Sequence, residues 1–379
     1  MNHWTDVMVA NYPTPTLQLV EGRGALVKGN DGKQYLDLIG GIAVQTLGHS
    51  HPAVVEAATK QMETLQHTSN LYAHEPGLTL ATMLQARTYG YHVLFVNSGT
   101  EANEAALKVV RARCQDNPES VVLAFGGSFH GRTAGSLALT GQAKHKHGFG
   151  PLPDQIVHVP FNDVDALEEM LRAHDVGAIF FEPIQGEGGV IPMTEAMATA
   201  LQNAQTQGTL LVADEVQTGI GRTGSFWAHQ VHGLQPDIIT SAKALGAGLP
   251  LGACLMRPEL AEGFGPGSHG CTFGGNPVAA AASIAMLQEL ETQRLVPRVA
   301  KLGTRIQETL ASEGVSFRGA GLLWAIDHDD PGEAQSVLEN KGILVGSAGK
   351  ALRISPAFTV NETELLEAVS TICEVIKTP

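Results

Sequence analysis

The sequence predicts an α/β protein with a large domain on a mostly parallel sheet and a smaller α+β domain made from both ends of the chain. The chain has 379 residues, more than one hydrophobic core usually serves. From about residue 90 to residue 256, short apolar runs alternate with amphipathic stretches, which is the pattern of buried strands joined by crossover helices. The two flanks lack this alternation, so we expect them to fold separately from the middle.

The expected strands of the large domain are short apolar runs bounded by turns. They cover residues 93–96, 121–125, 156–159, 178–181, 210–213, 237–240 and 253–256. Amphipathic helices are expected over residues 101–113, 163–173 and 194–207. Ligands of such sheets bind where strands end at their carboxyl side, so the loops that follow these runs are where a site is expected.

The flanks predict the smaller domain. Residues 18–40 are typical of a hairpin that turns at Asn30-Asp31-Gly32. After residue 276 we expect two long helices, strands over residues 319–326 and 352–354, and a final helix that begins near Asn361. The expected division is an N-terminal segment (1–49) that joins the small domain, a large domain (50–270), and the C-terminal small domain (271–379).

Composition excludes several classes of partner. The formal net charge of −14 disfavours nucleic acid and anionic lipid. The four cysteines are scattered and form no Cys/His set, so we expect a reducing compartment and no metal site. The first residues lack the basic and apolar regions of a signal peptide, and no apolar run reaches the roughly 20 residues of a membrane helix. We therefore expect a cytoplasmic protein with small-molecule partners.

Ser98-Gly99-Thr100 lies between an expected strand and an expected helix. Free N–H groups at the start of a helix, together with two hydroxyl groups, form an anion site suited to a phosphate. Helix caps use the same residues freely, so this segment alone favours an ordinary capped helix.

An acidic and a basic residue follow two other expected strands. Asp214 ends one apolar run and could hold a protonated ring nitrogen, with a solvated strand end as the alternative. Lys243 precedes a glycine-containing loop, and a lysine in such surroundings can have a lowered pKa and act as an imine-forming nucleophile, with a surface lysine as the alternative. A phosphate cradle, a carboxylate and an amine together are the parts that a pyridoxal 5′-phosphate site needs.

The chain resembles the class III (fold type I) pyridoxal-phosphate aminotransferases. The resemblance extends from about Tyr12 to Arg353. Its blocks are residues 98–104, 128–133, 181–189 and 214–219, Lys243, and residues 272–277. Several long blocks in the same order are a specific signal.

The resemblance implies roles for individual residues around the cofactor. Lys243 would hold the cofactor covalently and carry the proton, and Asp214 would pair with the pyridine nitrogen. The other implied cofactor contacts are Ser98, Gly99 and Thr100 at the phosphate, Phe129 and Val216 on the two ring faces, and Gln217 near the ring hydroxyl. Thr272 would reach the phosphate of the neighbouring subunit, which implies a homodimer.

The resemblance also implies the substrates. Arg132 and Tyr12 would bind the α-carboxylate of an acylated ornithine, and Arg353 would bind that of glutamate. Glu187 would pair with Arg353 when an ω-amine is bound, although an ordinary ion pair is the alternative. The implied reaction moves the δ-amino group of N2-acetylornithine to 2-oxoglutarate in a ping-pong mechanism, giving N-acetylglutamate 5-semialdehyde and glutamate.

Three alternatives stay open. Another ω-amine donor (ornithine, succinylornithine, succinyl-diaminopimelate or 4-aminobutyrate) would use the same fold. An aminomutase would need no keto-acid acceptor. A non-catalytic binding protein would have no need of Lys243, Asp214 and Arg132 together.

Overall fold

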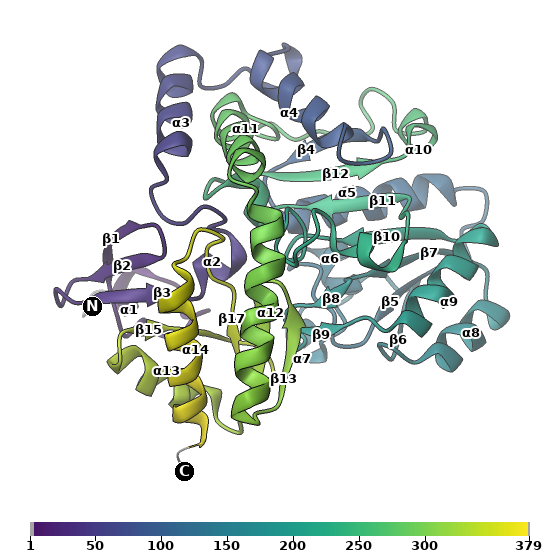
Figure 1. Ribbon diagram of the computed structural model, residues 1–379. Helices are drawn as coiled ribbons and strands as arrows, with labels where there is room; N and C mark the ends of the chain where they lie inside the picture. Colours follow the sequence, from purple (N-terminus) through teal and green to yellow (C-terminus); the bar gives the residue numbers. More distant parts are fainter. Residues whose placement is uncertain (1–3, 378–379) are drawn as a thin grey trace.

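The computed structural model describes residues 4–377 and contains a large α/β part beside a smaller part built from both ends of the chain (Figure 1). The large part is centred on a seven-stranded sheet of order β4-β12-β11-β10-β7-β5-β6. In chain order these strands are β4 (His92–Val96), β5 (Val121–Phe125), β6 (Ile156–Val159), β7 (Val176–Phe181), β10 (Leu210–Asp214), β11 (Ile238–Ser241) and β12 (Gly252–Met256). Strand β12 alone runs in the opposite direction to the other six, so the predicted mostly parallel sheet is confirmed.

Both faces of this sheet are buried, which explains why its strands read as continuous apolar runs. On one face, Leu123 and Ile179 pack with α8 (Val164–Ala173) and α9 (Glu195–Thr206). On the other face, the alternate side chains Val122 and Phe180 pack with α5, α6 and α10. These helices are α5 (Gly99–Arg113), α6 (Ala134–Leu139) and α10 (Pro258–Glu262). The strand period of two therefore assigns each side chain to one of two helical layers.

The small domain joins segments from both ends of the chain, as predicted. A four-stranded sheet of order β1-β2-β3-β15 pairs β15 (Ile343–Leu344) with β3 (Gln34–Asp37) in parallel. A second sheet has the order β13-β14-β17-β16, and all its pairings are antiparallel. Its strands are β13 (Phe317–Ala320), β14 (Leu323–Asp327), β16 (Gly346–Ser347) and β17 (Ala351–Ile354). The predicted boundaries at residues 49/50 and 270/271 stay a prediction.

Two expected strand runs are interrupted by glycines. The hairpin expected over residues 18–40 is a three-stranded meander, because Gly24 (φ +59°) divides its first arm into β1 (Leu19–Arg23) and β2 (Leu26–Gly29). The single strand expected over residues 319–326 is likewise the hairpin β13–β14, which turns at Gly321 (φ +56°). A positive φ is accessible to glycine at little cost, so a local glycine can end a strand that the apolar pattern alone would continue.

Long helices connect the two parts. The two helices expected after residue 276 are α11 (Pro277–Thr292) and α12 (Leu295–Glu313), and the final helix is α14 (Glu362–Lys377). In Figure 1, α12 runs beside α14 in the small domain, while α11 lies next to α3 (Pro52–Thr64) and α4 (Glu75–Gln85). Helix α13 (Pro331–Asn340) completes the small domain.

The remaining short elements lie in connections. They are α1 (Trp4–Val7), α2 (Gly40–Ala43), η1 (Ser69–Leu71), α7 (Ala143–Lys146), β8 (Ile184–Gln185), β9 (Ile191–Pro192), η2 (Ala228–His232) and η3 (Lys243–Gly246). Within residues 4–377, no helix combines the length and the apolar character that crossing a membrane requires.

Candidate active site

The predicted blocks converge on one cavity of about 410 Å³ at the carboxyl ends of the parallel strands. The predicted site residues that line it are Ser98, Gly99, Thr100, Phe129, Glu187, Asp214, Val216, Gln217 and Lys243. They lie at or just after the ends of five different strands, β4, β5, β8, β10 and β11, and are up to 145 positions apart in the chain. The described residues contain no group of three or more His, Cys, Asp or Glu that could hold a metal ion.

An anion cradle forms where β4 leads into α5. Ser98 is the N-cap of α5, and its hydroxyl accepts a hydrogen bond from the N–H of Glu101 (3.2 Å). The N–H groups of Gly99 and Thr100 belong to the first turn, so they have no acceptor inside the helix. A Cβ on Gly99 would lie 2.7 Å from Cγ1 of Val216, so only glycine lets these two segments meet. Free N–H groups and the positive end of the helix dipole suit a phosphate.

A buried carboxylate ends β10. Asp214 is 4% exposed, and Oδ2 lies 2.7 Å from Nδ2 of Asn103 and 2.8 Å from Nδ1 of His130. The N–H of Val216 donates to Oδ1 (3.0 Å). Asn103 is itself held by the hydroxyl of Thr240 (2.9 Å), so the network fixes where the carboxylate points.

His130 is fully enclosed beneath this carboxylate. Burial opposes its protonation, but the hydrogen bond and the charge of Asp214 outweigh burial and raise the pKa of the imidazole. Sequence reasoning assigned no role to His130 or Asn103, although both lie inside the quoted blocks. The available signal was Asn103 on an otherwise apolar helix face, because a buried amide requires partners.

The candidate nucleophile follows β11. Lys243 has a left-handed backbone (φ +45°), which is uncommon outside glycine and typical of functional sites. Burial lowers the pKa of Lys243, and the carboxylates of Glu187 and Asp214 offset only part of this effect. A lower pKa leaves more of the amine neutral at neutral pH, which is the form that attacks a carbonyl.

An ion pair crosses from the large part to the small domain. Nη1 of Arg353, on β17, lies 2.5 Å from Oε1 of Glu187. Gln217 joins the pair, since it donates to Glu187 (3.2 Å) and accepts from Arg353 (3.3 Å). Burial alone would raise the pKa of Glu187, but the charges of Arg353 and Lys243 outweigh it, and the pKa is lowered. The structure thus places the pair that the sequence predicted beside the candidate nucleophile.

Phe129 lines the cavity, with three titratable side chains near it. The guanidinium of Arg132 lies 5.4 Å from the ring centroid, and His145 contacts the ring edge-on at 5.8 Å. The N–H of Phe129 donates to the buried Glu182 (3.0 Å). Burial raises the pKa of Glu182 to about 8. Sequence reasoning missed His145 and Glu182, whose positions beside the ring depend on tertiary packing.

Two predicted site residues lie away from the cavity of their own chain. Tyr12 is 71% exposed, and Thr272 is exposed in the loop before α11. Neither lines the cavity, and its lining residues also lack the exposed Arg132 and Arg353, which contacts the lining residues Glu187 and Gln217. The roles predicted for Tyr12, Arg132 and Thr272 stay predictions.

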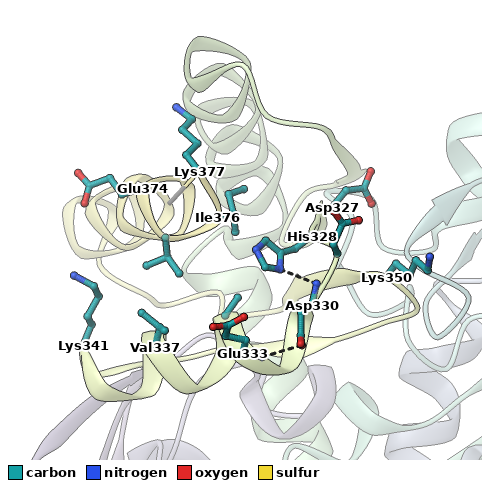
Figure 2. A pocket seen from close by; sticks show the side chains of 13 residues that line it. Asp327, His328, Asp330, Glu333, Val337, Lys341, Lys350, Glu374, Ile376 and Lys377 are labelled. Carbon is teal, nitrogen blue, oxygen red and sulfur yellow. Dashed lines mark hydrogen bonds between the residues drawn. The ribbon is translucent and has the colours of Figure 1, made fainter. Parts of the chain in front are cut away.

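A larger hollow of about 970 Å³ lies in the small domain, between α13 and the last turn of α14 (Figure 2). The carboxylate of Asp330 there is the N-cap of α13 and accepts from the N–H groups of Gly332 and Glu333. The backbone N–H of Asp330 donates to Nδ1 of His328. No predicted site residue lines this hollow. We therefore place the chemistry in the smaller cavity, where the nucleophile, carboxylate and anion cradle meet.

Comparison with known proteins agrees with this arrangement. The sequence model of the family described as aminotransferase class-III matches residues 7–376. The chain belongs to the class III aminotransferases. This class III aminotransferase is 45% identical to the acetylornithine aminotransferase of Mycolicibacterium smegmatis over 391 aligned positions, which cover 100% of this chain and 98% of the relative.

Solved structures agree as well. The ornithine aminotransferase of Toxoplasma gondii, crystallised with partial occupancy of pyridoxal phosphate at its active site, superposes with a TM-score of 0.94 at 31% identity. The match covers 99% of this chain and 93% of that one. The acetylornithine aminotransferase of Elizabethkingia anophelis gives a TM-score of 0.88 at 29% identity and covers 99% and 97% of the two chains. The fold type I architecture of this class III aminotransferase is therefore shown.

Proposed function

We propose that this aminotransferase moves the δ-amino group of N2-acetylornithine to 2-oxoglutarate, a step of arginine biosynthesis, with pyridoxal 5′-phosphate bound in the cavity. The observation that carries the proposal is the Glu187–Arg353 ion pair beside Lys243. The close similarity to enzymes named acetylornithine aminotransferase supports the choice of donor.

The residues of the cavity fit the cofactor. When bound, pyridoxal 5′-phosphate supplies a carbonyl that takes the amino group and a ring that draws electrons from the reacting carbon. Gly99 and Thr100 would hold its phosphate, and Asp214 would hold the protonated ring nitrogen. The other proposed contacts are Ser98 at the phosphate, Phe129 and Val216 on the ring faces, Gln217 at the ring hydroxyl, and Lys243 as covalent anchor and proton carrier.

The ion pair would let one site accept two different substrates. Arg353 can bind an α-carboxylate bidentately only when it gives up Glu187. With an ω-amine donor no carboxylate arrives there, so Glu187 keeps the buried guanidinium neutralised. With 2-oxoglutarate, the substrate carboxylate would replace Glu187. Arg132 and Tyr12 would bind the carboxylate at the other end of the donor.

We propose that the enzyme is a homodimer in which Thr272 reaches the partner's cofactor phosphate. The loop that carries Thr272 is joined to η1, because Nδ2 of Asn70 donates to the carbonyl of Cys271 (2.9 Å). Three large apolar side chains there are exposed, Leu71 by 85%, Tyr72 by 74% and Phe273 by 59%. An exposed apolar patch of this kind fits a surface covered by a second copy.

A half-reaction tests the function directly. The purified, cofactor-loaded protein is mixed with N-acetylornithine without acceptor, and the visible absorbance of the bound cofactor is followed. We expect the absorbance to fall and to return when 2-oxoglutarate is added. Ornithine, succinylornithine, succinyl-diaminopimelate and 4-aminobutyrate are compared as donors under the same conditions.

Each outcome decides between the alternatives. A response to ornithine but not to N-acetylornithine would overturn the proposed donor and keep the cofactor. Turnover that does not depend on 2-oxoglutarate would indicate an aminomutase. A protein that cannot be loaded with the cofactor would overturn the whole proposal.

A further inference from the structure

Arg222 is a buried arginine that the proposed chemistry does not use. It is 0% exposed, and no carboxylate lies within ion-pair distance of it in residues 4–377. Burial lowers the pKa of Arg222 to about 9, so it still carries its charge at neutral pH. Among the residues that the structure describes, its Nε and Nη2 atoms find no hydrogen-bond partner. Burying such a group is costly, so stabilising the fold is a poor explanation for a cation at this position.

The side-chain hydrogen bonds of Arg222 both go to the small domain. Nη1 donates to the carbonyl of Leu322 (3.1 Å) and to that of Pro356 (2.6 Å). The guanidinium also lies 4.6 Å from the ring centroid of Phe358. The backbone carbonyl of Arg222 accepts from the N–H of Leu322 (2.9 Å). These contacts fix one residue of the large part against two loops of the small domain.

Those two loops lie together at one end of the antiparallel strand pair that carries Arg353. Leu322 directly precedes β14, and Pro356 follows Arg353 by three positions. Strands β14 and β17 pair with Ala325 opposite Arg353. Arg222 therefore holds one end of this strand pair, where β14 begins and β17 ends.

The same segment of chain also lines the candidate cofactor cavity. Asp214, Val216 and Gln217 precede Arg222 by only five to eight positions, and Gln217 contacts Arg353 directly. Gly321 is required for the close approach, since a Cβ there would lie 2.6 Å from the carbonyl oxygen of Arg222. A short, closely packed stretch of chain thus connects the cavity-lining segment 214–217 to the strand of Arg353.

We propose that Arg222 is a positioning residue that sets the distance between Arg353 and the cavity-lining segment 214–217. It would thereby determine how well the acceptor carboxylate is bound. The inference rests on the proposed role of Arg353. A misplacement of about 1 Å in a reacting substrate can cost about a hundredfold in rate, so a small displacement of this strand has a measurable effect.

The chain offers a matched control. Arg298, on α12, also donates to two backbone carbonyls of the loop after β17, those of Phe358 (3.0 Å) and Val360 (2.6 Å). It stabilises that loop but makes no link to the segment that lines the cavity. Arg298→Met therefore reports on general loosening of the loop.

The experiment compares the two half-reactions of the cofactor-loaded enzyme in Arg222→Met, Arg222→Lys, Arg298→Met and Arg353→Lys. For Arg222→Met we expect the 2-oxoglutarate concentration at half-maximal rate to rise about tenfold to a hundredfold. The half-reaction with N-acetylornithine should change less than about threefold, because that donor does not use Arg353. Arg222→Lys should recover part of the loss, and Arg298→Met should show no preference for either half-reaction.

Several results would overturn the inference. It fails if both half-reactions weaken equally in Arg222→Met, or if Arg298→Met reproduces the acceptor-selective loss. If Arg222→Met does not fold, Arg222→Lys decides by the same ratio of half-reactions. If Arg353→Lys leaves the acceptor step unchanged, the proposed role of Arg353 fails, and that result is distinct from a failure at Arg222 alone.

Discussion

At the scale of single residues, the cavity concentrates groups that are expensive to bury. Lys243 combines a left-handed backbone with a lowered pKa, and Arg353 is 5% exposed. A left-handed backbone at a residue other than glycine costs on the order of 1–3 kcal/mol, and burial of charge adds to it. These costs fall on residues that the proposed chemistry needs, which is where stability is usually given up for function.

Replacing Lys243 tests this view. Lys243→Ala should reduce turnover by about 10⁴-fold or more, because the variant lacks both the anchor and the proton carrier. The free energy of unfolding of the cofactor-free protein should not fall, since the substitution removes a buried amine. Turnover and urea unfolding are measured on the same preparation. Near-normal turnover would refute the assignment of Lys243.

The buried carboxyl of Glu182 predicts a pH effect on stability. Its pKa is raised from 4.5 to about 8, so the folded state keeps a proton that the unfolded state releases. The stability from this group is fully present below about pH 4.5 and declines as the pH rises to about 8, by no more than about 1.4 kcal/mol per pH unit.

Glu182→Gln removes this titration. In urea unfolding of the cofactor-free protein between pH 5 and pH 8, stability should decline less steeply in the variant than in the wild type. Equal slopes for the two proteins would contradict a neutral Glu182.

At the scale of elements, the start of α5 joins local and tertiary requirements. Ser98 caps the helix, which is a local requirement of helix formation. Gly99 meets a tertiary requirement, because a Cβ there would clash with the side chain of Val216, which follows β10. A helix that needed only a cap would accept alanine at its first position readily. The glycine therefore marks the close approach of two segments that we propose bind the same cofactor.

Gly99→Ala should weaken cofactor binding more than it weakens the fold. The added methyl would displace Val216, which we propose packs on the cofactor ring, so we expect about a tenfold rise in the Kd for pyridoxal phosphate. The Kd is measured by titrating the cofactor-free protein. Gly265→Ala is the control, since nothing lies within 4 Å of a Cβ at Gly265. Equal Kd values for the two variants would contradict the proposed cradle.

At the scale of the whole molecule, the site lies between the large part and a small domain that is built from both ends of the chain. Lys243 belongs to the large part and Arg353 to a strand of the small domain, which also incorporates residues 19–37. The proposed homodimer adds a third contribution, from the loop that carries Thr272. In the proposed function, substrate binding therefore depends on how the two parts are held together.

Phe273→Asp tests the dimer. A charge on an exposed ring that a second copy should cover is expected to shift the protein toward monomer and to raise the Kd for the cofactor about tenfold or more. Mass is measured by sedimentation and cofactor binding by absorbance. Val231→Asp is the control, because Val231 is 65% exposed and lies in η2, outside this loop. An unchanged dimer in Phe273→Asp would place the interface elsewhere.

The sequence alone predicted the seven strands of the large sheet and the helices α5, α8 and α9, because apolar period, helix caps and buried runs are local properties. It did not predict the helices α3, α4, α6 and α10. Strand ends at Gly24 and Gly321 were missed, since the apolar pattern continues through a residue whose backbone turns. The ordered blocks around Ser98, Asp214 and Lys243 predicted residues that do line one cavity.

Only the tertiary structure decided which distant groups touch. Glu187 and Arg353, 166 positions apart, form an ion pair that the family resemblance implies but that no local sequence pattern shows. Asn103 and His130 hold the carboxylate of Asp214, and Arg222 holds the strand of Arg353, although no local pattern connects these residues. The physical reason is that hydrogen bonds and desolvation depend on distances in the folded chain, whereas a sequence pattern records only separations along it.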